Sequence, residues 1–143
     1  MKCLLTLFCI TLLSIAYGQS PMNVKADADQ KLVAFIKKSK FEGEAGTSFN
    51  GLSNPNLKSD LTKLINQSAK DFLTIVNNHP TEAKFQNEIG QGLTRFNKFY
   101  TQLDSEDEDR ICSYFEELMD CVGLQSSNGQ LNKWRYGFDP GKK

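Results

Sequence analysis

The chain has 143 residues with 17 basic side chains, 17 acidic side chains and one histidine, so its net charge near neutral pH is zero. A neutral chain lacks the basic surface that neutralises nucleic-acid phosphates or anionic lipid headgroups, and we expect neither as a partner. A single histidine also excludes a metal site built from several histidines. Because no metal-ligand spacing, nucleotide-binding loop or adjacent nucleophile and base is found, the sequence predicts no metal and no cofactor.

Residues 1–18 have the parts of a secretory signal peptide. Lys2 precedes an apolar run from Cys3 to Ala16, and small residues, Ala16 and Gly18, precede the predicted cut. A membrane anchor would need about 20 apolar residues, more than this run contains. A bacterial lipoprotein would need a cysteine directly after the cut, where Gln19 stands. We therefore predict export to the periplasm or the medium, which leaves residues 19–143 as a single domain with no membrane contact.

Two of the four cysteines leave with this segment, and Cys112 and Cys121 remain. Both lie in one predicted helix, nine residues apart. Their Cα atoms would then be about 13 Å apart on opposite flanks of the helix. A disulfide needs Cα atoms closer than about 7 Å, so we expect buried free thiols.

Four stretches show helical periodicity, and none shows a sustained period of two. The first predicted helix covers residues 27–39 and presents one apolar face, formed by Leu32, Phe35 and Ile36. A loop rich in Gly, Ser and Asn follows over residues 43–54. Its two large apolar side chains, Phe49 and Leu52, are expected to pack onto the core.

The second predicted helix begins where Asn54 can act as N-cap and Pro55 can occupy the first helical position. It ends before Pro80, because proline disfavours helical geometry in the residue that precedes it. Its apolar stripe comprises Leu57, Leu61, Leu64, Ile65, Phe72, Ile75 and Val76.

Thr81 can cap the third predicted helix, whose apolar face is unusually thick and aromatic. Gly90 and Gly92 interrupt this helix, and each costs about 1 kcal/mol relative to alanine. Because Gly92 lies near the apolar stripe, we expect it to allow close approach of a neighbouring helix. The stripe comprises Phe85, Ile89, Leu93, Phe96, Phe99, Tyr100 and Leu103.

The fourth predicted helix begins at Ser105 and Glu108, which fit the capping box, and ends at Gly123, a suitable left-handed residue. Five carboxylates crowd residues 104–109, where the helix dipole favours negative charge. The cluster lacks the glycine and the final glutamate of an EF-hand loop, so we expect no bound cation. The buried face comprises Ile111, Tyr114, Phe115, Leu118, Met119 and Val122.

Four amphipathic helices joined mostly by short connections predict an all-α domain resembling a four-helix bundle. The remaining segment begins with a turn, or a cap for a short helix, at residues 126–129 and is rich in aromatic residues. We expect this tail to dock across the bundle and complete its core. The apolar side chains concerned are Leu131, Trp134, Tyr136 and Phe138.

Few residues suggest catalysis. His79 lies in a turn, where solvated histidines are common, and it would need a nucleophile or acid brought near by the fold. A carboxylate pair drawn from Glu116, Glu117 and Asp120 could cleave a glycosidic bond. Their positions fall mostly off the apolar stripe, so a solvated polar face is the expected arrangement.

The candidate binding residues are Trp134, Arg135, Tyr136 and Asp139. Tryptophan, tyrosine and arginine are enriched at binding hot spots, and they serve equally well to close a core. The sequence leaves both roles open.

Residues 111–140, ICSYFEELMDCVGLQSSNGQLNKWRYGFDP, carry a family resemblance. Through the helix YFEELMD and the ending WRYGFDP, this stretch resembles the C-terminal part of a small bacterial family known only as a domain of unknown function. The N-terminal segment, with glutamine after the cut, is similar to those of exported proteins of Bacteroidetes-type bacteria. Neither resemblance implies an activity or site residues.

These observations favour a non-enzymatic binding or interaction module whose partner is an unidentified protein or small molecule of the cell envelope. A small cell-envelope hydrolase that gathers carboxylates from different helices is the alternative from another class. An inhibitor or immunity-type protein, which would neutralise a secreted effector, remains a third possibility.

Overall fold

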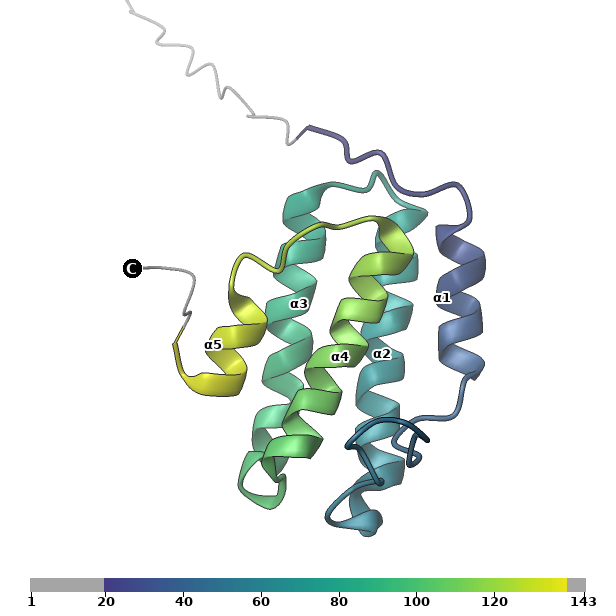
Figure 1. Cartoon of the computed structure of the whole chain (residues 1–143). Helices are drawn as coiled ribbons and strands as arrows, with labels where there is room; N and C mark the ends of the chain where they lie inside the picture. The colour runs from purple at the N-terminus through teal and green to yellow at the C-terminus, as the bar shows by residue number, and fades with distance from the viewer. Residues whose placement is uncertain (1–19, 139–143) are drawn as a thin grey trace, which may run out of the picture.

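The computed structural model describes residues 20–138, so the predicted signal peptide and Asp139 lie outside it. Within this range the regular elements are helical (Figure 1). They are α1 (Ala28–Lys37), η1 (Pro55–Leu57), α2 (Lys58–Val76), α3 (Glu82–Phe96), η2 (Asn97–Gln102), α4 (Ser105–Val122) and α5 (Gln130–Tyr136), where η marks a 3₁₀ helix. The predicted all-α, bundle-like fold is confirmed, and the tail adds a short fifth helix. In the described part, no helix has the length and apolar character that crossing a membrane requires.

The four long helices lie side by side and bury the apolar stripes that the sequence predicts (Figure 1). α2 contacts α1, α3 and α4, and α5 packs on α3 and α4. Aromatic rings meet in the centre, with ring centroids 5.1 Å apart for Phe72–Phe85 and 6.2 Å apart for Phe96–Phe115. The core includes Leu32, Phe35, Leu61, Ile65, Phe72, Phe85, Ile89, Leu93, Phe96, Ile111, Tyr114, Phe115, Leu118 and Val122.

The long loop between α1 and α2 crosses one end of the bundle (Figure 1). Phe49 and Leu52 are buried in it, as predicted. Phe41 is also buried, and its backbone N–H donates to the hydroxyl of Tyr114 over 2.7 Å. The loop therefore covers the end of the core with side chains, and α4 holds its backbone in place.

Three predicted helix boundaries are confirmed by their hydrogen bonds or backbone angles. The side chain of Asn54 accepts from the N–H of Asn56 and caps η1, the 3₁₀ turn that leads into α2. The side chain of Thr81 accepts from the N–H of Lys84 at the start of α3. Gly123 ends α4 in the left-handed conformation, with φ of 81°.

The predicted capping box of α4 is displaced by one residue. Asp104, not Ser105, is the N-cap, and its side chain accepts from the N–H of Asp107 over 2.9 Å. The carboxylate of Asp107 accepts in return from the N–H of Asp104 over 3.2 Å. Aspartate is as favourable an N-cap as serine. Because the buried Asp107 completes the capping box, the side chain of Glu108 is available to pair with Arg135.

The third helix is shorter than predicted, because α3 ends at Phe96 and the chain tightens into η2. A 3₁₀ turn has three residues instead of 3.6, so the apolar stripe no longer continues along the same face. Phe99 and Leu103 are consequently only partly buried, and Tyr100 is 36% exposed.

Both remaining cysteines are free thiols in the unbroken helix α4, as predicted, although each is only half-buried. Burial raises the pKa of Cys112 to about 12, so this thiol is protonated and unreactive at neutral pH.

The close helix approach predicted at Gly92 is confirmed, and α3 approaches two helices there, α2 and α4. A Cβ atom at this position would lie 2.5 Å from Ser68 Oγ of α2 and 2.8 Å from the ring of Phe115 of α4. Neither neighbour can move away easily, since both are fully buried.

We predict that Gly92→Ala lowers the free energy of unfolding by about 2 kcal/mol, because overpacking outweighs the gain in helix propensity. Urea unfolding followed by circular dichroism measures the effect. Gln91→Ala, on the exposed side of the same turn, is the control and should change little. A Gly92→Ala variant more stable than the parent would show that the helices separate at no cost.

Candidate functional site

Arg135 fixes α5 to α4. Its Nη1 lies 2.7 Å from Glu108 Oε2, and its Nε lies 2.5 Å from Asp109 Oδ1. The Arg135 side chain is only 15% exposed. Burial raises the pKa of Glu108 above its usual value, and the charge of Arg135 offsets only part of this shift. Much of the acidic cluster thus serves to cap α4 and to hold α5.

Trp134 fixes α5 to α3. Its indole Nε1–H donates to Asn97 Oδ1 over 2.9 Å. The ring meets Phe96 and Tyr100 edge-on, with centroid distances of 6.4 and 5.4 Å. Trp134 and Leu131 are therefore the tail residues that join the packing, as the sequence predicts for them.

Tyr136 and Phe138 do not complete the core, which corrects the prediction for the end of the tail. They are 52% and 62% exposed, and their ring centroids lie 6.4 Å apart. The chain leaves α5 through Gly137, whose φ of 76° is left-handed, and Phe138 follows this turn with its ring exposed.

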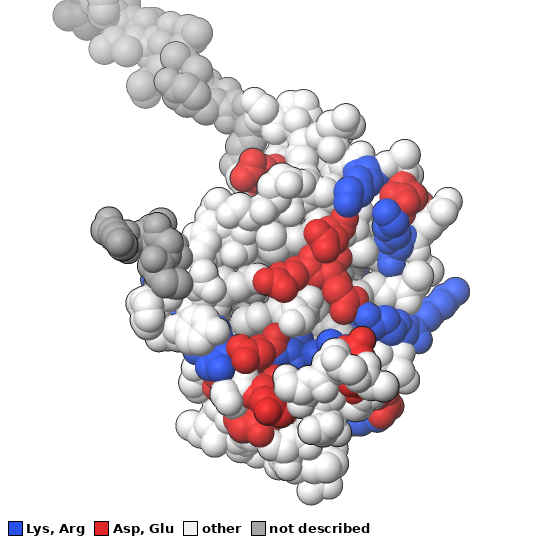
Figure 2. All heavy atoms as spheres, viewed as in Figure 1, with Lys and Arg blue, Asp and Glu red and all other residues white. Residues whose placement is uncertain are grey.

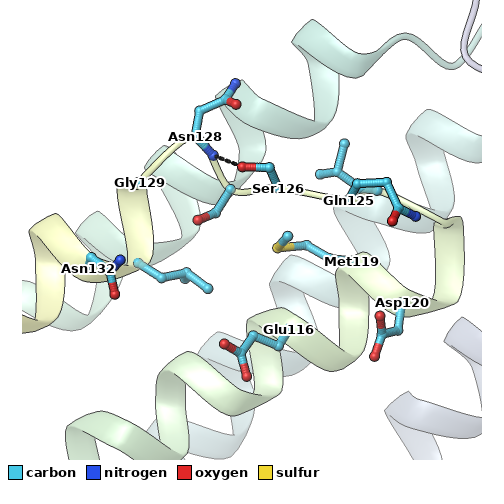
Figure 3. A pocket seen from close by; sticks show the side chains of 11 residues that line it. Glu116, Met119, Asp120, Gln125, Ser126, Asn128, Gly129 and Asn132 are labelled. Carbon is cyan, nitrogen blue, oxygen red and sulfur yellow. Dashed lines mark hydrogen bonds between the residues drawn. The ribbon is translucent and has the colours of Figure 1, made fainter. Parts of the chain in front are cut away.

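A polar hollow of about 990 Å³ lies between α4, α5 and the segment that joins them (Figure 3). We call it the α4–α5 hollow. Asn128 and Gly129, with φ of 52° and 79°, turn the chain from α4 into α5, which confirms the turn predicted at residues 126–129. The lining comprises Glu116, Met119, Asp120, Leu124, Gln125, Ser126, Ser127, Asn128, Gly129, Leu131 and Asn132.

The charged groups of the α4–α5 hollow are two carboxylates, Glu116 and Asp120, one turn apart on α4 (Figure 3). Both residues are exposed, and neither carboxylate forms a hydrogen bond or ion pair with any of residues 20–138. The buried side chains of Met119, Leu124 and Leu131 give the hollow an apolar floor. Figure 2 shows acidic side chains gathered over α4, with basic side chains beside them toward α1.

Glu117 faces a different hollow, between α1 and α4. Its carboxylate lies 2.5 Å from Lys38 Nζ, and both residues line a space of about 650 Å³. Glu116 and Glu117 therefore do not flank a common substrate position. His79 is exposed in the turn between α2 and α3, as expected. Among residues 20–138, no group of three or more histidine, cysteine or acidic side chains is arranged to hold a metal ion.

A second space of about 700 Å³ lies between α3 and α5. We call it the α3–α5 groove. It is more apolar than the α4–α5 hollow, and its walls include the rings of Tyr100 and Trp134. The lining comprises Gly90, Leu93, Thr94, Asn97, Tyr100, Gln130, Lys133 and Trp134.

A model of a domain of unknown function, DUF4844, matches residues 23–139. The chain belongs to this family. The match confirms, at the level of an uncharacterised domain family, the resemblance found in the sequence. The DUF4844 domain is also similar to the crystal structure of a DUF3571 family protein from Acinetobacter baumannii AYE, with 31% identity and a TM-score of 0.70. That likeness covers 77% of this chain and 89% of the other. No curated protein matches the chain.

The DUF4844 domain also contains a buried polar network between α2 and α3. Arg95 lies 2.8 Å from Asp71 and 3.0 Å from Glu88, and it donates to Ser68 over 3.1 Å. Glu88 is only 7% exposed. Burial, followed by the nearby charge of Asp71, raises the pKa of Glu88 to about 7, although Arg95 opposes the shift. The local sequence does not predict this network, although the spacing of Glu88 and Arg95 places both on one face of α3.

We predict that Trp134→Ala destabilises the domain by about 2 kcal/mol, because it removes the contact of α5 with Phe96 and the hydrogen bond to Asn97. Tyr136→Ala, which removes an exposed ring from the same helix, should change stability by less than about 0.5 kcal/mol. Chemical denaturation of both variants gives the two values. Equal stabilities would mean that Trp134 does not anchor α5.

The raised pKa of Glu88 predicts a pH-dependent stability. Folding favours the protonated carboxyl of Glu88. Its contribution to the free energy of unfolding is therefore fully present below pH 4.5, the pKa of glutamate in the unfolded chain, and is lost as pH rises through about 7. Between pH 4.5 and 8 the parent should therefore lose on the order of 2 kcal/mol more than Glu88→Gln, whose amide does not titrate. Urea unfolding across this pH range tests the difference in slope. The exposed Glu82→Gln is the control, and parallel curves for Glu88→Gln and the parent would refute the prediction.

Proposed function

We propose that this protein is an exported, non-enzymatic binding module that acts in the periplasm or outside the cell. The α4–α5 hollow carries the proposal, because it presents two carboxylates that pair with nothing among residues 20–138. Export is supported by the signal-peptide features of residues 1–18, which are similar to those of Bacteroidetes-type exported proteins.

The chemistry of the α4–α5 hollow suits a basic segment of a partner protein. Glu116 and Asp120 can bind an ammonium or guanidinium group, and charge complementarity of this kind sets specificity and association rate. The side chains of Gln125, Ser126 and Asn132 can bind the polar groups of a peptide. The apolar floor can receive the methylene stem of a lysine or arginine.

The candidate binding residues of the tail divide into two roles in this proposal. Trp134 and Arg135 position α5, and with it one wall of the α4–α5 hollow. Tyr136 exposes its ring at the end of α5 and is proposed to contact the partner directly. Asp139 follows it in the sequence and remains a proposed contact residue. An inhibitor or immunity-type protein would use the same surface, so the identity of the partner distinguishes that role.

We predict that the mature protein retains a protein partner from the envelope extract of its source cell, and that Glu116→Gln/Asp120→Asn loses it. Glu82→Gln/Asp60→Asn is the matched control, because it removes the same charge from exposed positions on α3 and α2. Retention should weaken in high salt, since exposed charges are screened.

A partner retained equally by both double variants would refute the assignment to the α4–α5 hollow. An extract from which the parent retains no protein in stoichiometric amount would refute a stable protein partner.

A further inference from the structure

We propose that the α3–α5 groove is a separate binding site for a small aromatic carboxylate. This inference goes beyond the proposed function, because the groove is lined by α3, η2 and α5 and shares no lining residue with the α4–α5 hollow. The two spaces also differ in chemistry, since a lysine lines the α3–α5 groove and two carboxylates line the α4–α5 hollow.

The rings of Tyr100 and Trp134 form an aromatic corner in the groove. Their planes are perpendicular, at 90°, and their centroids lie 5.4 Å apart. The buried Leu93 also lines the groove, and the side chain of Gln130 packs against the backbone of Gly90 beside it. A planar ligand could stack on one ring and meet the other edge-on, and both arrangements are favourable for aromatic pairs.

The polar groups available in the groove are mainly donors. Lys133 is the charged residue of its lining, and its Nζ has no hydrogen bond or ion pair within residues 20–138. Asn97 uses Oδ1 to accept from the indole of Trp134, which leaves its Nδ2 amide as a donor. A carboxylate can accept from donors of this kind, whereas an amine would be repelled by the charge of Lys133.

The other polar side chains of the groove are already occupied, with one exception. Thr94 Oγ1 donates to the carbonyl of Gly90 over 2.9 Å. Gln130 Nε2 donates to Gln86 Oε1 over 2.8 Å. Gln130 Oε1 remains as an acceptor, so a ring hydroxyl or N–H on the ligand would add a hydrogen bond. These constraints define the ligand as an aromatic ring with one carboxylate.

The experiment is a titration of the folded protein with phenylacetate, followed by the indole ¹H–¹⁵N resonance of Trp134. This resonance needs no assignment, because the chain contains one tryptophan. We expect a saturable shift with phenylacetate and a much weaker response to phenethylamine, which has the same ring and a positive charge. Acetate, which lacks the ring, should produce no saturable shift.

Lys133→Gln should raise the dissociation constant for phenylacetate about threefold, the effect of losing one exposed ion pair. Lys98→Gln removes a lysine that does not line the groove and should bind as the parent does. Both lysines are exposed, so neither variant is expected to affect folding. Equal responses to phenylacetate and phenethylamine, no saturable shift, or an unchanged constant in Lys133→Gln would overturn the proposal.

Discussion

The packing of this domain depends on the absence of a side chain at Gly92. α3 can touch Ser68 of α2 and Phe115 of α4 at the same level only because no Cβ atom separates them. Close packing there brings Arg95, one turn along α3, within reach of Asp71 on α2. Gly90 has the corresponding role on another side of α3, where a Cβ would lie 2.7 Å from Gln130 Oε1 of α5. Two residues that weaken α3 as an isolated helix therefore let it contact three other helices.

Both candidate sites exist because α5 is attached at a few points instead of along a continuous apolar face. Leu131 is its buried residue, Trp134 joins it to α3, and Arg135 joins it to α4. A short helix with a longer apolar stripe would fill the space on both sides with side chains. The ion pairs of Arg135 and the hydrogen bonds of Trp134 and Gln130 hold α5, while the α4–α5 hollow and the α3–α5 groove remain open to solvent.

Much of the fold follows from local sequence, whereas the sites do not. Periodicity and caps depend on residues three or four apart, so the four long helices and most of their ends could be predicted. The end of α3 could not be predicted, since apolar residues continue at helical spacing through η2, where the tighter turn moves them off the buried face. Lys40 was also missed: it is 1% exposed, its Nζ donates to the carbonyl of Lys38 over 2.7 Å, and burial lowers its pKa to about 8. Long aliphatic stems let such residues enter a core with no apolar signal in the sequence.

Net charge conceals the feature on which the proposed function rests. A net charge of zero is compatible with acidic side chains gathered over α4 and basic side chains toward α1, because net charge does not say where charged residues lie (Figure 2). The structure also separates charges that hold the fold from charges that do not. Arg135 pairs with Glu108 and Arg95 pairs with Glu88, and removing either arginine would leave a buried glutamate without its partner. Glu116, Asp120 and Lys133 contribute no such pair within residues 20–138, so their charges remain available to bind a partner or ligand.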